Sequence, residues 1–219
     1  MKTTTTRALF TAAALIATGS AMGGSNVSPN RKFAWGENIG WINWRDADST
    51  NQGVRLYSRF LSGFAWGENI GWINMGNGAP AGGSYANTNN TNFGVNIDPS
   101  TGVCSGFAWG ENIGWINFNT TPAVGAQGAR YDLAAGRFRG FAWGENIGWI
   151  NLDDTGTYVC ALYSDLNADG SVNTSDLVLL LVNFGQNVTP GFGADFDASG
   201  IINTTDLTQL LVQFGRVCQ

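Results

Sequence analysis

Apolar and polar residues follow the same pattern four times in the middle of the chain. Phe-Ala-Trp-Gly-Glu-Asn-Ile-Gly-Trp-Ile-Asn occurs unchanged at 33–43, 64–74, 107–117 and 141–151. Its start alternates as a β-strand does, its two glycines bracket a turn, and Trp-Ile-Asn returns the chain. Each copy therefore predicts a β-hairpin. Phe and the first Trp project from one face of the strand, and we expect that face to build a shared core.

A further short strand is predicted before three of the copies, at 54–56, 95–97 and 129–131. Each such unit is then a three-stranded antiparallel meander, and the first copy lacks the extra strand. A lone hairpin is marginally stable in water, so the units must pack together. The sequence predicts a mainly β repeat region over 28–157 and leaves propeller, barrel and solenoid arrangements open.

Helical spacing replaces alternation near the C-terminus. Apolar residues recur at 177, 180, 181 and 184, and again at 207, 210, 211 and 214. Each segment opens with hydroxyl residues and an aspartate and ends at a glycine, as helix starts and stops do. We predict helices over 174–184 and 204–214 that bury their apolar stripes against each other.

Oxygen-bearing side chains precede each helix with the spacing of an EF-hand calcium loop. In 165–176 and 195–206 they occupy positions 1, 3, 5, 9 and 12, glycine holds position 6, and position 7 offers its carbonyl. The sequence predicts two Ca²⁺ ions. The predicted ligands are Asp165, Asn167, Asp169, Ser171, Asn173 and Asp176 in the first loop, and Asp195, Asp197, Ser199, Ile201, Asn203 and Asp206 in the second. The neutral Ser199 predicts weaker binding by the second loop, because affinity follows ligand charge.

The charge of this tail supports a cation site. All six acidic residues from 161 onward occupy predicted ligand positions, and Arg216 is the only basic residue there. The tail thus carries a charge of −5, equal to the net charge of the whole chain. Clustered carboxylates repel one another without a cation, so we expect the tail to fold only with calcium.

A calcium loop followed by one helix, in duplicate and with no preceding helix, resembles the dockerin family over about residues 163–216. The resemblance implies a small calcium-binding α-helical module that docks onto a cohesin-like domain, often on a scaffold of polysaccharide-degrading enzymes. It also implies that the hydroxyl residues at loop positions 10 and 11 contact the partner: Thr174, Ser175, Thr204 and Thr205. The family often carries basic residues further along each helix, whereas this chain has Leu181, Val182 and Gln186, then Leu211, Val212 and Arg216.

The chain contains three cysteines. The two ends of a dockerin-like module come together, so the resemblance implies a Cys160–Cys218 disulfide that closes a module spanning 160–219. Cys104 is left over, either as a buried small hydrophobe or as an intermolecular partner, and the buried interpretation is favoured.

The N-terminal residues 1–23 are typical of a secretory signal peptide. A start containing Lys2 and Arg7 leads into the apolar run 8–17 and then into small residues. That run is too short to span a bilayer, and no other segment is long enough. We therefore expect a secreted, extracellular protein without a transmembrane segment.

Composition argues against catalysis and nucleic-acid binding. The chain has no histidine, and its glutamates, Glu37, Glu68, Glu111 and Glu145, occupy one equivalent turn position. A glycosidase needs two carboxylates in different environments, so a glycoside hydrolase is the weakest interpretation. We assign these glutamates to turn capping or backbone hydrogen bonding, and we predict no catalytic residue. Scattered basic residues in an acidic chain make nucleic acid an improbable partner.

Two interpretations of function remain. The first is a secreted non-catalytic protein whose calcium tail docks it to a cohesin-like partner or a cell-surface scaffold while its repeats display a surface. The second is a carbohydrate-binding accessory protein in polysaccharide degradation, with Trp72, Trp115 and Trp149 as a ligand face. The repeated phrase is similar to GYAWSENIGWI-type repeats of secreted bacterial proteins, for which we know no defined function.

Overall fold

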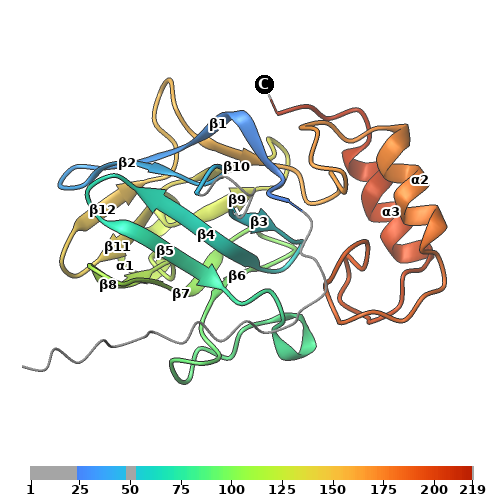
Figure 1. The fold of residues 1–219 in the computed structure, drawn as a ribbon, viewed down its shortest axis with the longest axis horizontal. Helices are drawn as coiled ribbons and strands as arrows, with labels where there is room; N and C mark the ends of the chain where they lie inside the picture. The colour runs from blue at the N-terminus through green and yellow to red at the C-terminus, as the bar shows by residue number, and fades with distance from the viewer. Residues whose placement is uncertain (1–23, 48–52, 219) are drawn as a thin grey trace, which may run out of the picture.

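The computed structural model describes residues 24–47 and 53–218, so the signal peptide predicted at 1–23 lies outside the described residues. A β-barrel makes up most of the molecule, and a small helical module lies at one side (Figure 1). Within the described part, no helical segment combines the length and apolar character needed to cross a bilayer.

Each copy of the repeated phrase forms an antiparallel hairpin. The hairpins are β1 (Val27–Gly36) with β2 (Gly40–Asn43), β4 (Leu61–Gly67) with β5 (Gly71–Gly76), β7 (Cys104–Gly110) with β8 (Gly114–Asn117), and β11 (Phe141–Gly144) with β12 (Gly148–Asn151). Neighbouring hairpins pair along the chain, and β12 pairs back onto β1. The eight strands therefore close into an antiparallel barrel, one of the three arrangements that the sequence left open.

Shorter elements surround the barrel. Strand β3 (Arg55–Leu56) pairs with β4, and β6 (Val95–Ile97) pairs with β7. Strands β9 (Arg130–Asp132) and β10 (Arg137–Arg139) pair with each other, and β13 (Val159–Ala161) joins β10 to β1. The connections contain the helical turns η1 (Ala81–Gly83), α1 (Thr121–Val124) and η2 (Gly125–Gln127).

The repeated phrase points alanine and isoleucine into the barrel interior, not the phenylalanine and tryptophan that we expected there. The buried inward set is Ala34, Ala65, Ala108, Ala142, Ile42, Ile73, Ile116 and Ile150. Phe and Trp project outward instead, and Trp109 is 36 % exposed. The expectation that Phe and the first Trp of the phrase build the core was wrong. The interior of an eight-stranded barrel is just wide enough for side chains to fill it, and the aromatic residues of the core cluster, Trp44, Phe118, Tyr131 and Phe138, lie outside the repeated phrase.

A ring of asparagines ties the four turns together. In each turn the isoleucine N–H donates to the carbonyl of the preceding glycine, and the isoleucine side chain is buried. The asparagine Nδ2 then donates to the isoleucine carbonyl of an adjacent hairpin. These four bonds, each 3.0–3.1 Å, are Asn38 to Ile147, Asn69 to Ile39, Asn112 to Ile70 and Asn146 to Ile113. The glutamates beside these asparagines are exposed, and their assignment to turn capping or backbone bonding stays a prediction.

We expect Asn112→Ala to destabilise the barrel by about 1 kcal/mol, because it removes one bond of this ring and leaves the Ile70 carbonyl without that donor. Urea unfolding followed by tryptophan fluorescence measures the effect, and Glu111→Ala at the exposed neighbouring position is the matched control. Equal midpoints for the two variants would show that the ring does not contribute to stability.

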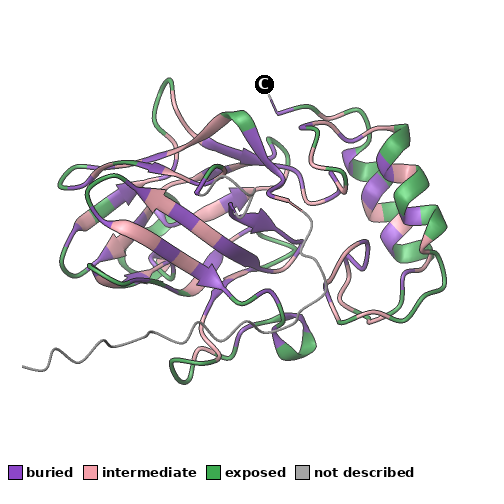
Figure 2. Ribbon diagram, in the orientation of Figure 1, coloured by how far each residue is buried: buried purple, intermediate pink, exposed green. Residues whose placement is uncertain are grey.

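The module contains two helices, α2 (Thr174–Val182) and α3 (Thr204–Gln213), close to their predicted bounds. Leu180 and Leu210 meet in its core. The predicted apolar stripes are only half right, since Leu181, Phe184, Leu211 and Phe214 are 43–53 % exposed. The burial of Asp176 and Asp206 fixes the rotation of each helix and turns those residues to solvent, as the exposed outer helix faces in Figure 2 show.

Candidate calcium loops and docking face

In the first loop the backbone wraps around two fully buried carboxylates, Asp165 at position 1 and Asp176 at position 12. Asp165 accepts hydrogen bonds from the N–H groups of Asp169 and Gly170, at 3.1 and 2.8 Å. Asp176 accepts from three backbone N–H groups, those of residues 166, 167 and 173. The first and last positions of the loop are thereby held together, as a sharp turn around an ion requires.

The second loop repeats this arrangement. Asp195 and Asp206 are fully buried. Asp195 accepts from the N–H groups of Ser199 and Gly200, and Asp206 accepts from those of residues 196, 197 and 203. Gly170 and Gly200, both at position 6, have φ values of 91° and 83°, which glycine adopts without strain.

Carboxylates converge at one point of the second loop. The ligand oxygens of Asp195, Asp197 and Asp206 all lie within 4.8 Å of one another. A hard cation such as Ca²⁺ takes oxygen ligands and tolerates irregular geometry, so the donor set fits it. In the first loop, asparagine replaces aspartate at position 3, and the acidic members are Asp165, Asp169 and Asp176. Each loop therefore has three carboxylates, so ligand charge does not support the weaker binding that Ser199 predicted for the second loop.

The loop carboxylates fall into two electrostatic classes. Burial raises the pKa of Asp165 to about 6, and it also raises the pKa of Asp195. Hydrogen bonds from Ser171 lower the pKa of Asp169. Burial opposes ionisation of Asp197, but bonds from Ser199 hold its pKa below the usual value. The position 1 carboxylates are the ones that gain most from a neighbouring cation, because burial otherwise disfavours their charge.

The residues at position 9 of each loop cap the helix that follows it. The side chains of Asn173 and Asn203 cap α2 and α3 by accepting from the N–H groups of Ser175 and Thr205. In this arrangement the amide nitrogen of Asn173, rather than its oxygen, faces Ser171 and Asp169 inside the loop. The role of these two residues as calcium ligands stays a prediction.

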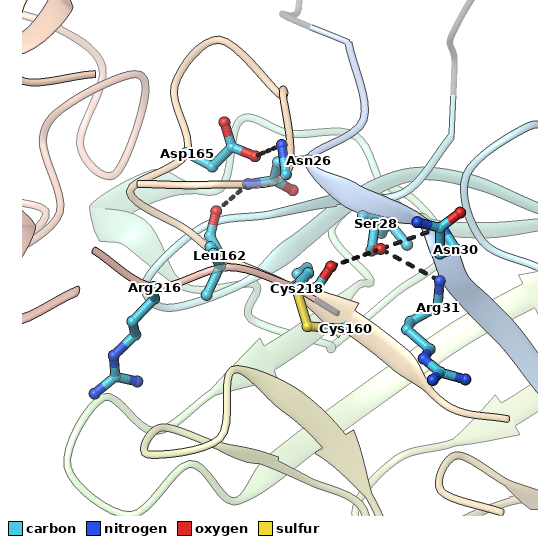
Figure 3. Close-up of a disulfide and its surroundings, with 12 residues drawn as sticks. Asn26, Ser28, Asn30, Arg31, Cys160, Leu162, Asp165, Arg216 and Cys218 are labelled. Atoms are coloured by element: carbon cyan, nitrogen blue, oxygen red, sulfur yellow. Dashed lines mark hydrogen bonds between the residues drawn. A yellow bond between two sulfur atoms is a disulfide. The ribbon is translucent and has the colours of Figure 1, made fainter. Parts of the chain in front are cut away.

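A disulfide joins the two ends of the module, between Cys160 and Cys218. Hydrogen bonds join this region to strand β1 and to the residue just before it. Ser28 Oγ of β1 donates to the Cys218 carbonyl, and Asn26 Nδ2 donates to the Leu162 carbonyl (Figure 3). Arg216 reaches the carbonyls of residues 133 and 134 on the barrel side. The disulfide thus sits where the module meets the barrel.

Cys104 is the unpaired cysteine of the described chain and is fully buried in the barrel cluster. Burial raises the pKa of its thiol to about 12, so it behaves as a small hydrophobe rather than as a reactive thiol.

The second loop also lies against the barrel, a contact that the sequence analysis missed. Phe192 packs on Tyr57, with ring centroids 5.9 Å apart, and Tyr57 stacks on Phe60. Ser58 Oγ donates to the carbonyl of Phe196, which is itself buried in the module core. The only sequence signal was the aromatic residues that flank an otherwise polar loop.

The predicted partner-contact residues Thr174, Ser175, Thr204 and Thr205 are exposed. Further along each helix, apolar residues are exposed at the positions where the dockerin family often carries basic residues. These residues, Leu181, Val182, Leu211 and Val212, are 50, 71, 53 and 65 % exposed. We call these eight residues the docking face. Each helix contributes an equivalent half, two hydroxyl residues and two apolar ones.

The predicted ligand-face tryptophans lie on the outside of three different hairpins. Trp115 and Trp149 are 40 and 37 % exposed, and Trp72 is half-buried. They are therefore distributed around the barrel and do not form one line. The repeat glutamates are exposed at the turns, one on each hairpin.

Comparisons with known proteins give one partial match. No family model matches the chain, and no curated protein matches it. Among solved structures, the chain is similar to one described as a type II cohesin–dockerin domain from Bacteroides cellolosolvens. The sequence identity is 36 %, the match covers 26 % of this chain and 88 % of that chain, and the TM-score is 0.24.

Proposed function

We propose that this chain is a secreted, non-catalytic calcium-binding protein whose C-terminal module docks the barrel onto a cohesin-like domain or a cell-surface scaffold. The observation that carries the proposal is the duplicated loop, in which carboxylates at positions 1 and 12 are fully buried and enclosed by backbone N–H groups. Four buried aspartates in so small a module call for a compensating positive charge.

Calcium in the loops supplies that charge and adds oxygen coordination when it is bound. Asp165 and Asp176 hold the first loop closed, and Asp195 and Asp206 hold the second. Asn173 and Asn203 link the closed loops to the helices, because they are the N-caps of α2 and α3. Loop closure therefore determines where the docking face is presented.

The docking face suits a partner whose surface is mostly apolar. Its hydroxyls offer a few hydrogen bonds, whereas Leu181, Val182, Leu211 and Val212 expose apolar area that gains free energy on burial. Apolar side chains exposed together at equivalent places on both helices are typical of an interaction surface.

A pull-down with purified cohesin-like domains tests the proposal on the full-length protein. We expect capture in CaCl₂, loss of capture in EGTA, and loss in calcium for the double variant Leu181→Asp, Leu211→Asp. The double variant Ala123→Asp, Ala126→Asp is the matched control, because it adds the same two negative charges at exposed positions of α1 and η2, away from the module. Undiminished capture in EGTA, or by the double variant, would refute calcium-dependent docking through this face.

A further inference from the structure

The four junctions between neighbouring hairpins share one register. At each junction the last asparagine of one hairpin lies opposite the first tryptophan of the next. These pairs are Asn43 with Trp66, Asn74 with Trp109, Asn117 with Trp143 and Asn151 with Trp35. Because side chains opposite each other lie on the same face of a sheet, the outside of the barrel carries the same residue set at every junction.

The aromatic rings on the outside of each hairpin pack against one another. Within every hairpin the second tryptophan packs edge-on against the first, with ring centroids 4.6–5.0 Å apart, and against the phenylalanine at 5.9–6.2 Å. This packing fixes the orientation of the rings although they face solvent. A ligand that stacks on them therefore loses little side-chain entropy of the protein on binding.

Three of the junctions are hollowed into equivalent grooves. Each is lined by the phenylalanine, second tryptophan and asparagine of one hairpin, together with the first tryptophan and glutamate of the next. In the order of the residue sets that follow, their volumes are about 650, 460 and 350 Å³. The three sets are Phe33, Trp41, Asn43, Trp66 and Glu68; Phe107, Trp115, Asn117, Trp143 and Glu145; and Phe141, Trp149, Asn151, Trp35 and Glu37.

Each groove offers hydrogen-bond donors and an acceptor beside its rings. The Oδ1 of Asn43, Asn117 and Asn151 accepts from the backbone N–H two residues on, which directs the amide N–H groups away from that bond. The glutamate carboxylate is exposed and can only accept while ionised. The residues that line the three grooves include no lysine or arginine.

We propose that these hairpin junctions are equivalent binding sites for the neutral pyranose units of a polysaccharide. The apolar face of a sugar ring stacks on tryptophan, and its hydroxyls both donate to the glutamate and accept from the asparagine amide. An acidic sugar would meet a carboxylate with no lysine or arginine among the lining residues; Lys32, whose Nζ lies 5.6 Å from the centroid of the Phe33 ring, is paired with Asp46. A quaternary ammonium ion would use the rings and the carboxylate but would leave the amide donors without a function.

Segments between the hairpins give each groove a different wall. Val124 and Gln127 border one groove, and Thr157 borders another. The groove beside Trp115 is bordered by residues 87–90 and Phe93, whose ring packs on Trp115 at 5.1 Å. Asn92 and Asn89 hold this border through side-chain bonds to backbone N–H groups. A common aromatic base with different walls fits sugar units that share a ring but differ in their substituents, and several grooves on one barrel raise avidity.

Affinity electrophoresis of the full chain in gels containing barley β-glucan, xylan or galactomannan tests the proposal. We expect retardation by at least one polysaccharide. We expect Trp143→Ala, and separately the quadruple variant Glu37→Gln, Glu68→Gln, Glu111→Gln, Glu145→Gln, to weaken binding about tenfold, the effect of losing a central contact. Phe184→Ala, an exposed aromatic residue of the module, is the matched control and should bind like the parent protein.

The glutamates are exposed at the turns, so the quadruple variant tests the grooves even if Trp143→Ala misfolds. The proposal fails if no polysaccharide retards the parent protein, or if the quadruple variant binds as the parent does. It fails equally if tetramethylammonium, and no polysaccharide, perturbs the tryptophan fluorescence, because the grooves would then be cation sites.

Discussion

Removing divalent cations with EGTA is expected to unfold the C-terminal module and leave the barrel folded. The four buried aspartates would then lack a cation to compensate their charge, which weakens the loops that cap α2 and α3. Circular dichroism at 222 nm reports the two helices. All nine tryptophans lie between 35 and 149, so their fluorescence reports the barrel.

The double variant Asp165→Ala, Asp195→Ala is expected to show the EGTA spectrum even in excess CaCl₂, because each loop loses its position 1 carboxylate. Asp154→Ala is the matched control, since Asp154 is an exposed aspartate outside both loops. If the double variant keeps the full helical signal in calcium, folding of the module is not coupled to these loops.

The second large effect is expected at the disulfide. Cys160 and Cys218 are 58 residues apart in sequence, and closing a loop of that length contributes about 4 kcal/mol in the chain-entropy model. The variant Cys160→Ala, Cys218→Ala should therefore lower the free energy of unfolding of the module by about that amount. Urea titration in saturating CaCl₂, followed at 222 nm, measures the change.

A reductant provides the control for this prediction. Dithiothreitol should shift the module transition of the parent protein toward that of the double variant, and it should leave the variant unchanged. Cys104→Ala should keep the sensitivity to reductant, because Cys104 takes no part in the bridge. Coincident transitions for the parent and the double variant would show that the disulfide contributes little stability.

Local structure could be predicted well from the sequence. The turn glycines and the alternation beside them predicted hairpins, and the hydroxyl–aspartate starts predicted helices that begin at Thr174 and Thr204. These features follow from contacts within a few residues. Closure of the barrel could not be predicted, since it depends on β12 pairing with β1, more than a hundred residues away in sequence.

The main error of the sequence analysis was the choice of which face of each hairpin points into the barrel, and its cause is physical. Ala34 and Ile42 are apolar, and so are Trp35 and Trp41 on the opposite face of the same hairpin. When both faces of a strand are apolar, alternation alone cannot assign the inside. The structure places the alanine and isoleucine of each hairpin inside the barrel and its tryptophans outside, where they line the grooves.

In the candidate site, too, features set by local spacing could be predicted and features set by packing could not. The loop ligands follow a fixed spacing that can be read along the chain, and the positions 1 and 12 lie where that spacing implies. The docking face depends on how each helix is rotated, which burial of Asp176 and Asp206 determines. The contact of Phe192 with Tyr57 joins residues far apart in sequence, and no local pattern indicates it.

The central claim is that paired loops of buried aspartates bind calcium. Isothermal titration of CaCl₂ into the chelator-stripped full-length protein tests it most directly. Our account predicts binding heat with a stoichiometry near two per chain, reduced to one by Asp206→Ala. The absence of binding heat, together with an unchanged helical signal, would contradict it.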